Sequence, residues 1–368
     1  MQTTFPMTDA AWTDTNLRAA SLLGDMAAVQ TDPHKRRGYA HAAAAIRDLP
    51  EQLDVLADGA DTLPRIARVG PSSARIVLEV LATGGSALVE RAVVESGKHG
   101  DIARRRALRD GFLSRAAALA VLGAAGRYDG YAADFQMHST WSDGRESVAA
   151  MAAACQARGY THAAMTDHAV GLPIAGGQSA EGFARQRREI DALNDALAGR
   201  FRMLRGVEAN IDGAGALDVP GAQRREFDLV VAAVHSGLRA ADDQTARLLG
   251  AVTAPGVHVL GHPRGRQFGT RGGVRASWPR IFRAAAGRQV AIELDGDPAR
   301  QDLDAGLAVR ALDAGCLFAL DSDAHAAAEL GYVDMAMAHA RLAGIPAERI
   351  VNCWPLDRLL AWLADRRS

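Results

Sequence analysis

The chain has 368 residues, of which 48% are hydrophobic and 23% charged, and its formal net charge is −1. A chain of this length and composition can bury a full core, and it suggests two domains or one large α/β barrel with an addition. Because the net charge is near zero, the protein as a whole has no general attraction for nucleic acid, and any site for a polyanion must be local.

The sequence shows no sign of export or membrane insertion. No stretch approaches the roughly 20 apolar residues that cross a bilayer. The start "MQTTFPMTDAAWTD" lacks the charged-then-apolar layout of a signal peptide. The three cysteines, Cys155, Cys316 and Cys353, lie far apart, which is typical of free thiols in a reducing compartment. We therefore expect a cytoplasmic protein that does not act at a membrane.

Helical patterns fill the first 125 residues. Apolar residues recur at helical spacing over residues 15–30, 39–50 and 107–126, which predicts amphipathic helices. Residues 61–82 indicate a helix, a tight turn at "VGPSSA" and a second helix. An all-α domain is therefore expected over residues 1–125.

From about residue 131 onward, short β-prone runs alternate with helical stretches. The runs cover residues 133–138, 161–166, 202–209, 228–235, 257–262, 289–294 and 316–325. The helical stretches cover residues 146–158, 180–198, 276–286, 303–315 and 331–343. This alternation predicts β/α units around a mainly parallel sheet of about seven strands. We expect a closed α/β barrel over residues 131–368, with the strand ends at one rim, where chemistry collects in such barrels.

Nearly every predicted strand ends in a histidine or a carboxylate. These residues are His138 with Asp143, Asp167 with His168, Glu208, His235, His262, Glu293, and Asp323 with His325. Five of the 11 histidines stand at such ends. Imidazole and carboxylate together suit divalent ions such as Zn²⁺, Mn²⁺ or Fe²⁺. The pattern therefore predicts a multinuclear metal site at the rim.

Six motifs in this half carry a family resemblance. "HSTWSDG", "MTDHA", "GVEANI", "AAVHSG", "LGHPRGR" and "LDSDAH" follow one another within residues 132–354 and resemble the successive motifs of the PHP (polymerase and histidinol phosphatase) domain. The resemblance implies a distorted (β/α)₇ TIM-like barrel that holds two to three divalent ions. It implies one ion between Gln136, His138, Glu208 and Asp323, a second between Glu208, His235 and His262, and a third between Asp143, His168 and His325.

Gln136 departs from the family pattern, which usually has a histidine at this position. An amide oxygen can still coordinate a metal, but more weakly than an imidazole and with a preference for hard ions. We therefore expect the first ion to be the most loosely held.

Two further residues are catalytic candidates. Asp167, beside His168, is expected to orient that ligand or to shuttle a proton, although capping of a helix is an equal alternative. Arg266, just beyond His262, is placed to meet a phosphate through its guanidinium fork. Adjacent divalent ions that activate water and hold phosphoryl oxygens need no protein nucleophile.

The helical half resembles the N-terminal 8-kDa-type domain of family X DNA polymerases over residues 13–95. Its "VGPSSA" turn is similar to a helix-hairpin-helix, which implies DNA-phosphate contacts from Arg68, Gly70, Ser72 and Ser73. Arg68 stands where the motif usually has its first glycine. No polymerase palm fits between residue 125 and the barrel, so polymerase activity is excluded.

These features predict a metal-dependent phosphoesterase that acts on DNA ends, as a 3′-5′ exonuclease or a 3′-phosphatase in repair. Its partner would then be DNA, as single strands or 3′ ends. One alternative is a small-molecule phosphatase of the histidinol-phosphatase type, whose partner would be a phosphorylated small molecule. Another is a DNA-binding scaffold with a degenerate PHP site.

Overall fold

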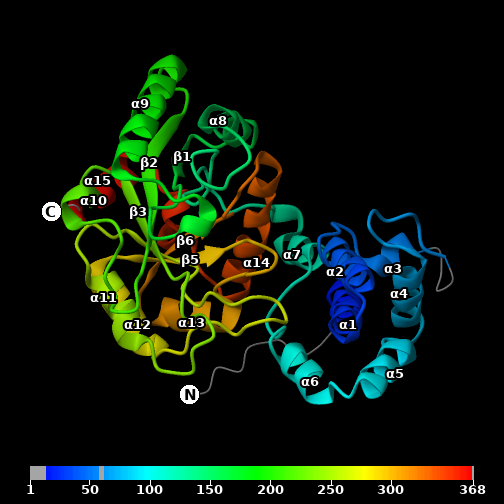
Figure 1. The fold of residues 1–368 in the computed structure, drawn as a ribbon. Coiled ribbons are helices and arrows are strands. Elements are labelled where there is room, and N and C mark those ends of the chain that lie inside the picture. The colour runs from blue at the N-terminus through cyan, green and yellow to red at the C-terminus, as the bar shows by residue number, and fades with distance from the viewer. Residues whose placement is uncertain (1–13, 58–61, 367–368) are drawn as a thin grey trace. The chain divides into compact units, whose positions relative to one another are not determined.

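The computed structural model describes residues 14–57 and 62–366. The chain divides into two compact units, residues 1–117 and 118–368, and Figure 1 shows both as ribbons. The N-terminal residues on which the expectation of no export signal rests lie outside the described ranges. No helix within those ranges is both long enough and apolar enough to cross a membrane.

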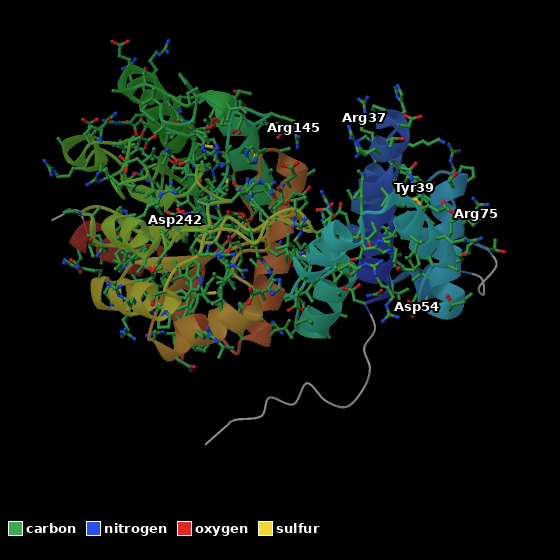
Figure 2. All side chains as sticks on the ribbon, turned by 60° about the horizontal axis from the view of Figure 1, so that its bottom comes forward. Arg37, Tyr39, Asp54, Arg75, Arg145 and Asp242 are labelled. Atoms are coloured by element: carbon green, nitrogen blue, oxygen red, sulfur yellow. The ribbon has the colours of Figure 1, made fainter. Side chains whose placement is uncertain are left out.

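The first unit is built of helices only, as far as it is described. These are α1 (Thr15–Val29), α2 (Pro33–Arg47), α3 (Leu53–Leu56), α4 (Pro71–Thr83), α5 (Ala87–Ser96) and α6 (His99–Ala107), followed by α7 (Arg115–Leu122) at the division. The Asp14 and Asp32 side chains cap α1 and α2, and Gly84 ends α4 in the left-handed conformation. Charged side chains such as Arg37, Asp54 and Arg75 lie exposed on its outside (Figure 2).

Two local predictions for this unit were wrong. Residues 62–66 are not helical, so the first helix of the expected hairpin is missing. Pro64 accounts for this, because it lacks an N–H and biases Leu63 away from helical geometry. The helix expected over residues 107–126 is interrupted between α6 and α7, where Gly111 has a φ of 68°.

The second unit is built on a six-stranded parallel sheet. The strands are β1 (His162–Met165), β2 (Arg202–Asn210), β3 (Leu229–Ala233), β4 (Val259–Gly261), β5 (Ala291–Asp295) and β6 (Leu317–Asp321), and each pairs with the next in chain order. The expected alternation of strands and helices is therefore confirmed, but the six strands form a curled half-barrel and not the closed barrel that was expected (Figure 1). All parallel strands present their C-terminal ends to the same rim.

Helices cover the outside of this sheet. They are α8 (Val148–Ala157), α9 (Ala180–Leu197), α10 (Gly221–Arg224), α11 (Thr245–Thr253), α12 (Trp278–Arg288), α13 (Ala305–Asp313), α14 (Val333–Leu342) and α15 (Leu356–Asp365). One buried apolar cluster joins α8, α12 and α14 to the strands. Another includes Phe135 and alternate strand residues together with Trp354 and Trp362 of the C-terminal segment. Burying both faces of the sheet fixes the register and therefore the side chains that reach the rim.

The first of the seven expected strands differs from the prediction. Residues 133–138 form only an isolated bridge, between Met137 and Ala324. The segment is still hydrogen-bonded to both neighbours, because the Ala164 N–H donates to Asp134 O at 3.0 Å and the His138 N–H donates to Ala324 O at 2.8 Å. The Phe135 N–H donates instead to the Asp321 carboxylate at 2.7 Å. Side-chain carboxylates thus replace part of the strand ladder.

A buried histidine in α14 makes the stability of the second unit depend on pH. Burial, together with the charge of nearby Arg266, lowers the pKa of His339 to about 3. The unfolded chain takes up this proton near pH 6.5. Because the folded chain does not, the free energy of unfolding falls as the pH drops through this window.

We expect wild-type protein to lose about 2 kcal/mol of stability between pH 7 and 5 through this residue alone. His339→Gln, which can still donate to Gln301, should reduce the pH dependence by that amount. Urea unfolding of the metal-free protein, followed by tryptophan fluorescence, measures it, and exposed His41→Gln is the control. An equal pH dependence in wild type and His339→Gln would contradict the assignment.

Candidate metal centre

Glu208 lies at the centre of the predicted ligands. Its side chain is buried near the end of β2, and its Oε1 atom lies 2.9 Å from His262 Nε2 and 3.2 Å from His235 Nε2. Its Oε2 atom lies 2.9 Å from His168 Nδ1 and 3.6 Å from His138 Nε2. One carboxylate is thus shared by four imidazoles from four different segments of the barrel.

A second set of ligands surrounds Asp143. Its carboxylate lies 3.6 Å from His168 Nε2 and 3.4 Å from His325 Nε2. His138 stacks on both His168 and His325, with ring centroids 4.4 Å apart in each pair. The four side chains of His138, Asp143, His168 and His325 form a group whose ligand atoms lie within 4.8 Å of one another.

Asp323 completes the arrangement beside His138. Its Oδ1 atom lies 3.0 Å from His138 Nε2, and Arg300 donates to its other oxygen. Eight of the nine predicted ligands are therefore linked by short nitrogen–oxygen distances.

The ninth predicted ligand, Gln136, is fully buried. Neither its amide oxygen nor its amide nitrogen has a hydrogen-bond partner, and a Cβ atom at Gly261, next to His262, would lie 3.2 Å from its oxygen.

These distances suit coordination of divalent ions. Ligand atoms about 2.1 Å from a tetrahedral ion lie about 3.4 Å from one another, which is close to the 2.9–3.6 Å separations around Glu208. Buried polar atoms without a partner, such as His138 Nδ1 and the Gln136 amide, are expected in a pocket shaped for cations. The residues present therefore fit a polynuclear metal site.

The carboxylates of the site are ionised at neutral pH. Burial alone would raise the pKa of Glu208, but His168 and His235 outweigh it and hold the pKa well below its ordinary value. Burial is likewise opposed at Asp143, where His325 and His138 lower the pKa to about 2. The pKa of Asp323 is also lowered, by Arg300 and His138 against the effect of burial. All three side chains can thus act as anionic ligands.

Two of the predicted ligands are held in strained backbone conformations. His262 and Asp323 both have positive φ angles, of 23° and 51°, which residues other than glycine rarely adopt. The His262 N–H donates to the buried Glu293 carboxylate. Glu293 therefore positions a predicted ligand from behind. Gly144 is required nearby, because a Cβ there would lie 2.5 Å from the His138 carbonyl group.

The two residues predicted to be catalytic do not reach the open part of the site. Asp167 is fully buried, and its oxygens accept from the Ser139 N–H at 2.8 Å and from the Ser139 and Ser142 hydroxyls. These hydrogen bonds hold the loop between His138 and Asp143 in position. Arg266 is only 3% exposed and donates to the backbone carbonyls of residues 300 and 301, so its guanidinium is used inside the fold.

A cavity of about 340 Å³ opens over the ligands. Besides five of the predicted ligands it is lined by two arginines, Arg271 and Arg300, and by the apolar side chains of Leu172, Ile174, Ala175, Val234 and Leu238. Sequence reasoning missed both arginines. Arg300 follows Asp295 and Asp297 just after β5, so the rule that loops after parallel strands share one rim could have found it.

The fold and this site define a metal-dependent hydrolase of the α/β type, and comparison with known proteins gives its family. The chain is 36% identical over 231 residues to the DNA polymerase/3′-5′ exonuclease PolX of Bacillus subtilis, an alignment that covers 62% of this chain and 40% of PolX. It is 31% identical over 174 residues to the probable phosphatase YcdX of Escherichia coli, which covers 45% of this chain and 68% of YcdX.

No family model matches the chain. Among solved structures, the histidinol phosphate phosphatase of Lactococcus lactis is similar, with 18% identity and a TM-score of 0.44 over 58% of this chain and 94% of that one. The YcdX match, over two thirds of the relative's length, is sufficient: the chain belongs to the PHP family of metal-dependent phosphoester hydrolases.

The unpartnered amide of Gln136 leads to a prediction about metal affinity. An imidazole is a stronger ligand than an amide for Zn²⁺ or Fe²⁺. We expect Gln136→His to tighten binding of one ion at least tenfold and to leave the other ions unchanged. Isothermal titration of metal-free protein with Zn²⁺, together with elemental analysis, measures both quantities. Identical binding curves for the variant and the wild type would show that residue 136 is not a ligand.

Proposed function

We propose that this protein is a divalent-metal phosphoesterase that removes phosphate or nucleotides from the 3′ ends of DNA. The observation that carries the proposal is the convergence of eight imidazole and carboxylate side chains around Glu208 and Asp143 beneath a cavity that two arginines line. Relatives named as an exonuclease and as phosphatases support the same chemistry.

We infer two to three ions from the ligand sets. We place one between Glu208, His235 and His262, a second at Asp143, His168 and His325, and a third at Gln136, His138 and Asp323 with Glu208 shared. Divalent ions held there would lower the pKa of a bound water and bind phosphoryl oxygens. Manganese, zinc and iron all suit this mixture of nitrogen and oxygen ligands.

The chain's own residues then bind and orient the ester. Arg271 and Arg300 line the cavity. Because Arg300 already pairs with Asp323, we assign to Arg271 the phosphate contact that the sequence suggested for Arg266. Arg271 uses its Nε atom to donate to Gly265 O at 2.7 Å, which leaves the rest of its fork for a phosphate. Asp167 and Glu293 keep the ligand-bearing loops in position from behind.

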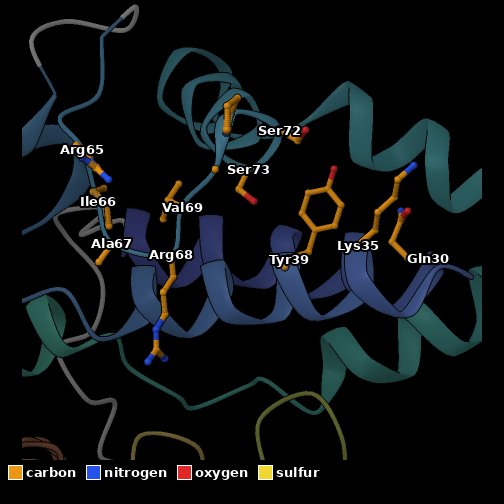
Figure 3. Close-up of a pocket in the computed structure, with 13 residues that line it drawn as sticks. Gln30, Lys35, Tyr39, Arg65, Ile66, Ala67, Arg68, Val69, Ser72 and Ser73 are labelled. Atoms are coloured by element: carbon orange, nitrogen blue, oxygen red, sulfur yellow. The ribbon is translucent and has the colours of Figure 1, made fainter.

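We assign DNA binding to the first unit. A cavity of about 660 Å³ lies between α2 and the start of α4, where Lys35, Arg65 and Arg68 supply positive charge. Figure 3 shows Tyr39 and Lys35 projecting from α2 on the side of Ser72 and Ser73. Gly70 caps α4 without a side-chain hydrogen bond, so the first N–H groups of this helix can meet a phosphate.

Arg68 adopts a φ of 67°, which is the left-handed geometry that the missing glycine of the hairpin motif would favour. Such a conformation costs an L-residue about 1–2 kcal/mol. An arginine in this strained position is explained if its charge contributes to phosphate binding.

The main rival is a small-molecule phosphatase. A cavity of about 340 Å³ is at the lower end of the range for small-molecule sites, and the similarity to YcdX covers more of that relative than the similarity to PolX. The charged cavity in the first unit has no role in this alternative. The scaffold alternative is disfavoured because eight ligand positions keep side chains that can bind metal.

Incubation of the purified chain and Mn²⁺ with oligonucleotides that end in 3′-phosphate or 3′-hydroxyl tests the proposal. We expect release of phosphate or of nucleotides, and a loss of at least a thousandfold in Glu208→Gln, which keeps the shape of the shared ligand but removes its charge. Turnover of small phosphate monoesters with no action on either oligonucleotide would favour the small-molecule rival. No turnover of any ester would favour the scaffold.

The DNA contact at Arg68 can be tested separately. We expect Arg68→Gly to change the stability of the first unit by about 1 kcal/mol or less, because relief of strain offsets the added flexibility of the unfolded chain. It should weaken DNA binding and lower the salt slope of the binding constant by about 1. Fluorescence anisotropy at several salt concentrations measures this, with exposed Arg91→Ala as the control. An unchanged salt slope would remove Arg68 from the interface.

A further inference from the structure

The cavity above the metal ligands has an apolar wall that phosphate chemistry does not require. Leu172 and Ile174, from the loop after β1, line it together with Leu238 from the loop after β3. The same cavity contains Arg271, Arg300 and the ligands. A phosphoryl group needs only the charged part, so the apolar part is available to contact another portion of a ligand.

Ile174 stands out among the apolar side chains of the described residues. It is 94% exposed, whereas its loop neighbour Val170 is 58% exposed. Ile174 belongs to none of the buried apolar clusters found in residues 14–57 and 62–366. A single exposed apolar residue needs no explanation by itself. What distinguishes Ile174 is its place on the wall of the metal-site cavity.

The loop that presents Ile174 is held firmly at both ends. It starts at His168, whose carbonyl oxygen accepts from the Gln178 N–H at 2.8 Å, and Ala169 forms a bridge with Gln178. A Cβ at Gly177 would lie 1.9 Å from Ala169 O, and one at Gly171 would lie 2.2 Å from the Asp218 carboxylate. The backbone at both ends of the loop is therefore packed too closely for a side chain at Gly171 or Gly177. Ile174, in the middle of the loop, remains exposed.

We propose that this wall, Leu172, Ile174 and Leu238, binds the nucleoside part of the substrate and makes the enzyme select phosphate esters that carry a flat apolar group. The inference rests on the proposed phosphoesterase function and specifies its substrate class. The charged part of the cavity holds the phosphate, and the apolar wall covers the base or sugar. A volume of about 340 Å³ suits a single terminal nucleotide.

Two esters of secondary alcohols separate binding of the organic group from the chemistry. Thymidine 3′-phosphate and glycerol 2-phosphate have similar leaving groups, and only the first carries a base. We expect wild-type enzyme with Mn²⁺ to prefer the thymidine ester in kcat/KM. In Ile174→Ala the ratio of the two kcat/KM values should fall about tenfold, in line with the loss of apolar groups from a substrate pocket.

Val170→Ala is the matched control, because Val170 is exposed in the same loop and is not part of the cavity wall. It should leave the ratio at the wild-type value. Turnover of glycerol 2-phosphate by Ile174→Ala would also show that this variant is folded.

The outcomes separate this inference from the proposed function. If wild type hydrolyses both esters and Ile174→Ala keeps the wild-type ratio, or if Val170→Ala lowers the ratio equally, the inference is overturned and the phosphoesterase function stands. Equal kcat/KM values for the two esters in wild type would overturn it as well. If wild type hydrolyses neither ester nor an oligonucleotide, the proposed function itself fails.

Discussion

A buried, ionised carboxylate must be surrounded by positive charge, and Glu208 imposes this constraint on the barrel. Removing a lone carboxylate from water costs, in the idealised limit, on the order of 20 kcal/mol. Protonated imidazoles could compensate it, but they repel one another, and burial together with the charges of His262 and His168 lowers the pKa of His235. Divalent ions bound here would balance the carboxylate without any need for protonated imidazoles, which suits this cluster of side chains to metal binding.

The surrounding structure holds some of these ligands in strained backbone conformations. Positive φ angles at His262 and Asp323 are strained conformations that a packed barrel can enforce. Glu293 sits in the barrel interior, where burial and neighbouring Asp321 raise its pKa well above the ordinary value. A raised pKa favours the neutral form of Glu293, which holds the His262 backbone without adding another negative charge. Negative charge is therefore concentrated at the rim and reduced in the barrel interior around Glu293.

The sequence alone predicted the features of the site that follow from one regular rule of folding. Parallel strands end at one rim, so His138, Glu208 and Asp323 could be placed together from the alternation of strands and helices alone. The sequence did not predict the features that depend on individual loops or side-chain contacts. The carboxylate of Asp321 interrupts the expected first strand, Pro64 removes a helix, and the backbone carbonyls of residues 300 and 301 bind Arg266. Arg271 reaches the cavity from a loop that carries no periodic signal.

Gln136 shows what a single departure from the family pattern does to such a site. A buried amide without partners costs about 1–3 kcal/mol for each unpaired group, and an apolar residue of similar size would avoid that cost. An oxygen ligand to a cation removes the penalty on the carbonyl side. Because amide oxygen favours harder ions than imidazole does, we expect an ion held by Gln136 to be manganese more readily than zinc, in contrast to one held by the usual histidine.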